Sequence, residues 1–303
     1  MKNLAKIPFI MAIWLANLSL SYSQTARDKI TFLSDYYMFF LDRVEENGKY
    51  SDSIYYETIM HPIYQEHFKS SEYANIVKQF YTRPIKDTLG LKNAIEKITK
   101  NQEAIKSNVA SALKKSREYI ENDSLIIYIT PVSLEKKQII KQMGGVMGLT
   151  AGSKQIILTI DTDVLGWENV LQYVVAHEYN HAYWTEKNFL KLTKWTLLDH
   201  LVFEGKADYF AHLIYPKVAI PWTMALTGKQ KEDLMNRVKS NFQNENISLQ
   251  MEIMFGSKNY PIWGGYSLGY DIVSLALANN SNLKVSEWTN LRADTILKLM
   301  KMK

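Results

Sequence analysis

Two histidines four residues apart, with a glutamate beside the first, form the group of residues best suited to chemistry. They are His177, Glu178 and His181, in a segment whose apolar residues recur at helical spacing. Residues four apart on a helix differ by about 40° and lie one turn apart, so both imidazoles can bind one cation. Glu178 is then placed to take a proton from a water molecule on that cation. The pattern predicts a Zn²⁺ site with hydrolytic chemistry.

Both histidines occupy the apolar face of the expected helix. The face comprises Trp167, Val170, Val174, His177, His181 and Trp184. Buried polar rings need partners, and a shared metal ion supplies one to both imidazoles. The alternative is a chance pentapeptide with two hydrogen-bonded core histidines. Because the chain has only six histidines, chance gives this motif with a probability on the order of 0.01.

A third metal ligand is expected because catalytic zinc is held by three protein groups. The metzincin pattern would place Gly at 184 and His at 187, but the chain has Trp184 and Lys187. A second helical segment carries Glu204 and Asp208 on a face otherwise made of apolar residues. Buried carboxylates without a cation or hydrogen-bond donors are unfavourable. Glu204, which follows His181 by 23 residues, is therefore the predicted third ligand.

Asp208 lies one helical turn beyond Glu204. From there it is expected to accept a hydrogen bond from the free ring N–H of a metal-binding histidine and so to fix its tautomer. The alternative is a surface acid at the edge of the helix. His200, one turn before Glu204, either borders the pocket or is a hydrogen-bonded core histidine.

The combined motifs resemble those of the gluzincin (thermolysin-like) zinc metallopeptidases. The tighter resemblance is to the YjaZ-like family of predicted Zn-dependent proteases. It is carried by His177-Glu-Tyr-Asn-His181, by Leu197-Leu-Asp-His-Leu-Val-Phe-Glu204-Gly-Lys-Ala-Asp208, and by Gly265-Tyr-Ser-Leu-Gly269-Tyr270. The resemblance implies that His177, His181 and Glu204 hold zinc and that Glu178 is the catalytic base.

Peptide hydrolysis also needs a hydrogen-bond donor for the oxyanion that forms on the attacked carbonyl. Tyr266, with Tyr270 behind it, is the candidate because both lie in a glycine-flanked segment. The alternative is an aromatic residue that packs on the core at the start of a helix. The glycine-rich segment before Gln155 is a candidate edge strand that would bind an extended peptide.

The elements that must position these residues indicate an α+β fold that is predominantly helical. Residues 24–120 are expected to be helical throughout, with helices over 26–47, 51–68 (interrupted by Pro62), 71–81 and 87–120. Short β-branched runs at 124–130 and 155–161 predict strands, and the glycine-rich segment between them predicts another strand and its turn. The small sheet packs on the helix that carries the two histidines. A helical C-terminal region follows, with loops around 216–228 and 241–265, and the catalytic region is assigned to 121–303.

The N-terminus resembles a secretory signal peptide. Two lysines precede a mostly apolar run from Ile7 to Leu20, and small residues follow, so residues 1–23 are assigned as a cleaved signal and export is predicted. The alternatives are an uncleaved anchor and a buried helix. No later stretch is apolar over about 18 residues, so no stable membrane insertion is expected after cleavage.

Composition excludes several functional classes. The chain of 303 residues has no cysteine, which excludes disulfides, zinc ribbons, iron–sulfur sites and cysteine nucleophiles. Without the signal, the chain has 34 basic and 31 acidic side chains, so its net charge is small. The lysine-rich stretch at 92–117 has the pattern of a solvated helix face. Nucleic acid is therefore not an expected partner.

The sequence is consistent with three functions. The first is an exported zinc metallopeptidase that acts on peptide or protein substrates. The second is a non-catalytic binding or assembly protein that retains a gluzincin fold, and the third is a zinc hydrolase with a different substrate. An intact Glu178 favours an enzyme, because a retained scaffold has no need of a base at that position. The oligomeric state has no signal in the sequence.

Overall fold

A four-stranded sheet in the middle of the molecule confirms the predicted α+β class. The computed structural model describes residues 28–191 and 194–301, so the predicted signal peptide lies outside the described residues. Three strands are parallel, and the fourth runs antiparallel at one edge, in the order β1-β2-β4-β3. The strands are β1 (Lys29–Phe32), β2 (Ile126–Pro131), β3 (Val146–Gly152) and β4 (Gln155–Ile160).

The strand β1 corrects the prediction that residues 24–120 are helical throughout. Four residues are too few to separate a strand from a helix by periodicity. Partners far along the chain fix this strand: β1 pairs in parallel with β2, and Asp28 binds Arg117 through two hydrogen bonds of 2.5 and 2.6 Å. Asp28 also accepts a hydrogen bond from the Leu125 backbone N–H.

The rest of the N-terminal region is helical, with two differences from prediction. Pro62 does not interrupt its segment, because it lies at the start of α3, where a missing backbone N–H is tolerated, and flanking π-helical turns continue the coil. The predicted helix over 87–120 divides at Asn101. The elements are α1 (Ser34–Glu46), α2 (Asp52–Tyr55), η1 (Tyr56–Met60), α3 (His61–Ile63), η2 (Tyr64–Phe68), α4 (Ala74–Phe80), α5 (Thr88–Lys100) and α6 (Gln102–Arg117).

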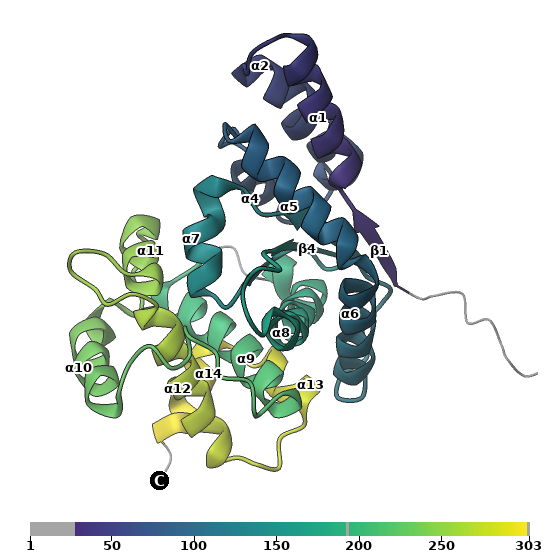
Figure 1. The fold of residues 1–303 in the computed structure, drawn as a ribbon. Helices are drawn as coiled ribbons and strands as arrows, with labels where there is room; N and C mark the ends of the chain where they lie inside the picture. Colours follow the sequence, from purple (N-terminus) through teal and green to yellow (C-terminus); the bar gives the residue numbers. More distant parts are fainter. Residues whose placement is uncertain (1–27, 192–193, 302–303) are drawn as a thin grey trace, which may run out of the picture.

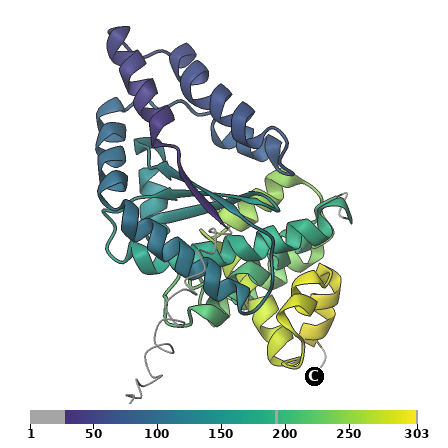
Figure 2. The same cartoon turned by 90° about the vertical axis from the view of Figure 1, so that its right-hand side faces the viewer.

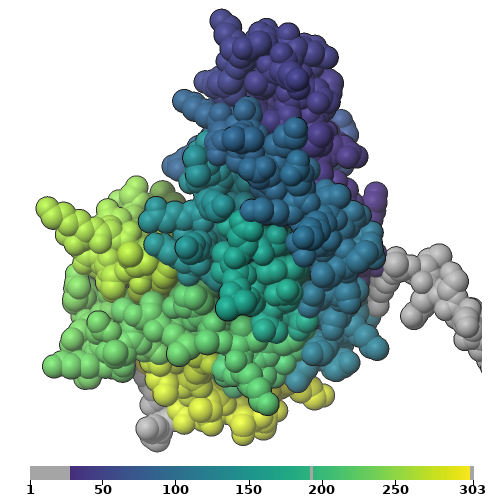
Figure 3. Space-filling view, viewed as in Figure 1, coloured from purple at the N-terminus to yellow at the C-terminus, as the bar shows by residue number. Residues whose placement is uncertain are grey.

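The two faces of the sheet bury different cores. Alternate residues of a strand point to opposite faces: Tyr128 and Ile157 join the core of the N-terminal helices, whereas Ile127 and Ile156 join the core that contains α8 (Trp167–Asn188). Figure 1 shows α1, α2, α4 and α5 at the top, and Figure 2 shows the sheet between these helices and the C-terminal helices. Helix α6 instead packs in the core that contains α8. Helices α1, α4 and α5 therefore pack directly on the sheet. Figure 3 shows that the N-terminal region forms a continuous surface with the rest of the molecule.

The chain from Leu134 onward contains two helices that the sequence pattern did not predict. Helix α7 follows β2 in the segment predicted as strand and turn, and α11 lies inside the predicted loop over 241–265. Among the described residues, no helix is both long and apolar enough to cross a membrane. The elements are α7 (Leu134–Gln142), η3 (Phe189–Lys191), α9 (Leu197–Ile214), α10 (Gly228–Val238), η4 (Lys239–Asn241), α11 (Ile247–Phe255), α12 (Gly264–Ala278), α13 (Val285–Asn290) and α14 (Ala293–Lys301).

Helices α9 and α12 cross at two glycines. A Cβ on Gly205 would lie 2.1 Å from the backbone oxygen of Gly269, and a Cβ on Gly269 would lie 2.1 Å from that of Leu201. The backbones therefore approach as closely as they do only because both residues lack a side chain. This contact fixes α9, which carries Glu204.

Replacing Gly205 by Ala is expected to force the two helices apart. The overpacked methyl group meets backbone, which cannot rotate away, so we expect a loss of at least about 2 kcal/mol in the free energy of unfolding. Urea denaturation measures this change. The control is Gly228→Ala, where a Cβ meets no atom within 4 Å and should change stability by less than about 1 kcal/mol. Equal stability of both variants would contradict the close crossing.

Candidate metal centre

Helix α8 carries the two histidines through the interior of the molecule. It begins after Gly166, whose φ of 81° is accessible to glycine, and runs for 22 residues beneath the sheet. His177, Glu178 and His181 are each at most 6% exposed. The predicted helix and the inward direction of both imidazoles are therefore observed.

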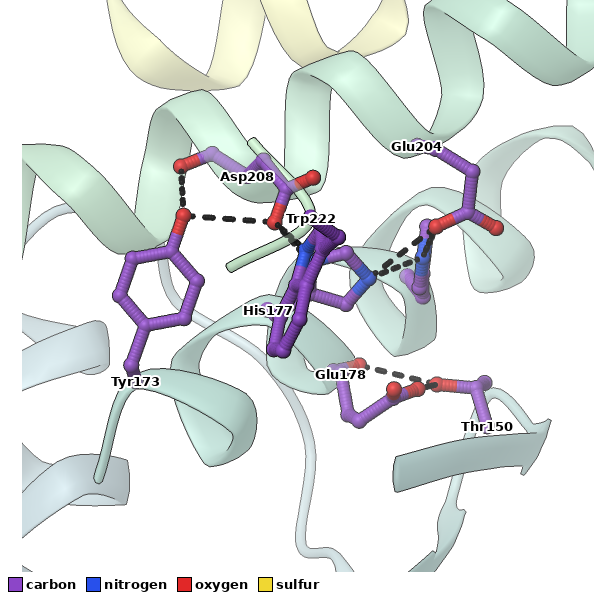
Figure 4. Close-up of polar contacts among 8 residues, drawn as sticks. Thr150, Tyr173, His177, Glu178, Glu204, Asp208 and Trp222 are labelled. Atoms are coloured by element: carbon purple, nitrogen blue, oxygen red, sulfur yellow. Dashed lines mark hydrogen bonds and ion pairs between the residues drawn. The ribbon is translucent and has the colours of Figure 1, made fainter. Parts of the chain in front are cut away.

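Helix α9 brings Glu204 to the same point. Its start is fixed by a capping box in which Thr196 and Asp199 exchange hydrogen bonds with each other's backbone N–H. The Oε2 atom of Glu204 lies 3.2 Å from Nε2 of His177 and 3.3 Å from Nε2 of His181, and the two Nε2 atoms are 2.9 Å apart. Figure 4 shows the side chains of His177 and Glu204 pointing toward one another.

This donor set fits Zn²⁺. Two imidazole nitrogens and one carboxylate oxygen, with room for a water molecule, are the ligands of a catalytic zinc. Ligand atoms at 2.0–2.1 Å from a tetrahedral ion lie about 3.3 Å from one another, and the observed separations of 2.9–3.3 Å are close to that value. Among the described residues, His177, His181 and Glu204 form a cluster that could hold a metal ion.

Asp208 accepts a hydrogen bond from Nδ1 of His177 at 2.9 Å. The same carboxylate oxygen accepts a hydrogen bond of 3.0 Å from Nε1 of Trp222 and one of 3.3 Å from the hydroxyl of Tyr173. Asp208 is fully buried, so it is not a surface acid at the edge of the helix. An N–H on Nδ1 leaves the lone pair of Nε2 free for a metal, as a metal-binding histidine requires.

His181 is held by a different contact. Its ring stacks on Phe203 of α9, with ring centres 3.9 Å apart and planes 18° apart. Its buried Nδ1 has no hydrogen-bond partner among the described residues. His200, one turn before Glu204, lines the adjoining cavity and packs on Trp195. The two imidazoles thus receive different support, one from a carboxylate and one from an aromatic ring.

Burial and neighbouring charges shift the pKa values of His177 and Glu204 in opposite directions. Burial lowers the pKa of His177, but the charge and hydrogen bond of Asp208 outweigh it and raise that pKa well above its usual value. Burial raises the pKa of Glu204, but the charges and hydrogen bonds of His181 and His177 hold it well below its usual range. Without a metal, these shifts favour a protonated His177 and an ionised Glu204.

Glu178 lies against the edge strand β3. The hydroxyl of Thr150 donates hydrogen bonds to Oε2 of Glu178 at 2.7 Å and to its backbone oxygen at 3.1 Å. A Cβ on Gly148 would lie 2.4 Å from Oε1 of the same carboxylate, so only glycine leaves room for it. The strand therefore both orients Glu178 and makes space for it beside the metal ligands.

A large and mainly apolar cavity opens beside these groups. Its volume is about 680 Å³, and His177, Glu178, His181 and Glu204 all contribute to its wall. Tyr266, in the first turn of α12, lines it as well, and burial raises the pKa of its hydroxyl well above the usual value. Tyr270 is not among the lining residues and instead packs near Tyr209 and His212.

Several site residues carry no recognisable signal in the sequence. Thr150, Tyr173, Phe203 and Trp222 support the metal ligands or Glu178, but each comes from a different stretch of the chain. Only the glycines around Thr150 hinted at a special segment. The contacts are made by tertiary packing, which spacing along the chain does not reveal.

The site has a donor set compatible with zinc and a glutamate in the same cavity, and the comparisons point to a predicted Zn-dependent protease. A family model described as "Predicted Zn-dependent protease (DUF2268)" matches residues 105–298, more than half of the chain, so the protein belongs to this family. The uncharacterized protein YjaZ of Bacillus subtilis is 23% identical over 218 residues, which cover 69% of this chain and 80% of that protein. No solved structure matches.

Replacing Asp208 by Asn is expected to weaken zinc binding tenfold to one-hundredfold, because the neutral amide accepts a weaker hydrogen bond from His177. Competition with a chromogenic chelator measures the affinity. The matched control is Asp271→Asn on α12, which removes an exposed carboxylate that pairs with Lys231. Equal zinc affinity in both variants would show that Asp208 does not support the site.

Zinc binding is expected to release a proton near pH 7. The ligand form of histidine is neutral, whereas His177 in the metal-free protein is protonated because its pKa is raised. Its pairing with Asp208 stabilises the metal-free fold fully below about pH 6.5, and this contribution is lost as pH rises through the raised pKa. Calorimetry in buffers of different ionisation enthalpy counts the protons. A count of zero would contradict the assigned protonation.

Proposed function

We propose that this protein is an exported zinc-dependent peptidase that hydrolyses peptide bonds with Glu178 as the general base. The observation that carries the proposal is the position of the Glu178 carboxylate. Glu178 lines the same cavity as His177, His181 and Glu204, and a hydroxyl of the edge strand orients its carboxylate. Membership of the protease family supports the same reaction class.

Zinc at the trio would polarise the substrate carbonyl and lower the pKa of a water molecule. Glu178 accepts the proton of that water and delivers it to the leaving amine. The hydrogen bond from the Thr150 hydroxyl fixes the orientation of the Glu178 carboxylate. Asp208 keeps Nε2 of His177 unprotonated when the metal is bound.

Tyr266 is the proposed donor to the oxyanion. Tyr266 lines the same cavity as Glu178, and the raised pKa of its hydroxyl keeps the proton on the oxygen at neutral pH. A protonated hydroxyl donates a hydrogen bond to a developing negative charge. The cavity thus presents an acceptor in Glu178 and a donor in Tyr266.

The free edge of β3 is the proposed binding site for the substrate backbone. The hydrogen bond from the Asp161 N–H to the Gly145 oxygen fixes the antiparallel pattern, in which Met147 and Leu149 bond to β4. The backbone groups of Gly148 and Thr150 therefore face away from the sheet. An extended peptide that pairs with them would hold its scissile bond beside Glu178.

The cavity wall favours apolar side chains in the substrate. Most of its lining is aromatic or aliphatic, which matches a peptide rather than a charged small molecule. The apolar lining includes Ile76, Phe80, Ile139, Met143, Met147, Leu149, Phe189, Trp195, Phe203, Ile247, Met251, Met254, Phe255 and Trp263. This composition disfavours one form of the third hypothesis, a zinc hydrolase that acts on a charged small molecule.

Export and the division into a signal peptide (1–23), an N-terminal region (24–120) and a catalytic region (121–303) remain part of this proposal. The alternative function is a non-catalytic binding or assembly protein. It differs in one testable respect, because such a protein needs the metal ligands but not the base.

Replacing Glu178 by Gln tests the two functions. We expect peptide and casein cleavage to fall by about 10²- to 10⁴-fold while zinc content stays at the level of the parent protein, because the amide cannot accept the proton. Metal analysis and digestion of a peptide library provide the measurements. The control, Glu186→Gln, removes an exposed carboxylate from the same helix. A zinc-loaded parent protein that cleaves nothing would support the binding protein instead.

A further inference from the structure

The free edge of β3 ends where the N-terminal region meets it. The backbone N–H of Tyr73 donates a hydrogen bond of 3.1 Å to the oxygen of Ala151. This oxygen lies at a bulge in β3, between Thr150 and Gly152. A peptide paired along Gly148 and Thr150 therefore meets the segment of residues 71–75 at this end of the strand.

The segment is fixed to the active-site helix. The hydroxyl of Tyr73 is hydrogen-bonded to Oγ1 of Thr185 at 3.1 Å, one turn beyond His181 on α8. The ring of Tyr73 packs edge-on against Phe189, with ring centres 5.3 Å apart. Residues 71–75, which form a barrier at this end of β3, are thus held against α8, the helix that carries His177 and His181.

Glu72 places a carboxylate at this barrier. Its oxygens accept hydrogen bonds from the backbone N–H of Ser153 at 3.2 Å and from the Ser153 hydroxyl at 2.5 Å. A Cβ on Gly152 would lie 2.1 Å from Oε2 of Glu72. The side chain is exposed and lines the large cavity. Glu72 is therefore oriented before any substrate binds.

The charges of the cavity distinguish the two ends of a peptide. Its described lining includes the carboxylates of Glu72, Glu178 and Glu204 but no lysine or arginine. A substrate carboxylate at Glu72 would be repelled and would find no cation, whereas an α-ammonium group would be attracted. The barrier therefore suits an amino terminus.

We propose that Glu72 binds the free α-amino group of the peptide substrate, so that cleavage occurs near the amino terminus. The inference rests on the proposed peptidase function. Gly148, against Glu178, and Gly152, against Glu72, lie four residues apart on β3, or about 13 Å at 3.3 Å per residue. The scissile bond is thus expected within about four residues of the amino terminus.

The test compares two apolar hexapeptides that differ only in acetylation of the α-amino group. Cleavage is measured with the zinc-loaded parent protein, and binding is measured calorimetrically with the zinc-loaded Glu178→Gln protein, which does not depend on turnover. We expect the free amine to be preferred by tenfold to one-hundredfold in both assays, as for a hydrogen bond between charged groups.

Glu72→Gln is expected to abolish this preference because the isosteric amide keeps the contact with Ser153 but lacks the charge. The matched control is Glu57→Gln, which alters another exposed carboxylate of the N-terminal region that accepts a serine hydroxyl, from Ser53. Thermal unfolding of each variant checks its folding, and the comparison of the two peptides on the parent protein needs no variant.

Each outcome decides one of the two proposals. Equal cleavage and binding of the two peptides would overturn the amino-terminal site and leave the peptidase function intact. A preference that persists in Glu72→Gln would overturn the assignment of Glu72. Absence of cleavage combined with a preference dependent on Glu72 in the binding assay would overturn the peptidase function but support the amino-terminal site.

Discussion

The candidate metal site depends on holding three side chains from two helices so that their ligand atoms lie within about 3.3 Å of one another. Two of them share α8, where the helical repeat aligns them, but Glu204 comes from α9 and its position depends on packing. The glycine crossing of α9 with α12 and the stacking of Phe203 on His181 supply that packing. The carboxylate of Glu204 is partly buried, and an isolated charge there would be unfavourable, so its position depends on the two imidazoles beside it.

The sequence predicted the parts of this site that follow from regular helical spacing. His177, His181, Glu204 and Asp208 were found because polar residues stood on faces where the pattern requires apolar ones. The α+β class and three of the four strands followed from similar patterns. Strand β1 did not, because its stability comes from pairing with a strand almost a hundred residues away.

The remaining site residues were beyond the reach of periodicity. Thr150 and Trp222 contact Glu178 and Asp208 only because the strand order and the loop after α9 bring them there. Nor did the sequence give a role to the N-terminal region. In the structure this region shares a core with the sheet and contributes Tyr73 and Glu72 to the cavity wall. The proposed peptidase site therefore has its candidate metal ligands on one part of the chain and part of its cavity wall on another.

The environment of Glu178 bears on whether the site is catalytic. His177 already pairs with Glu204 and Asp208, and His181 pairs with Glu204. A scaffold that only bound metal would gain nothing from a further carboxylate, that of Glu178, which is only 6% exposed. Such a group adds negative charge to a buried site and incurs a desolvation cost. Here Thr150 donates a hydrogen bond to it and Gly148 leaves it room, so two positions of β3 are fitted to this one side chain. A base that must accept a proton and release it to a leaving amine explains why a single carboxylate is accommodated so closely by the strand that would bind the substrate.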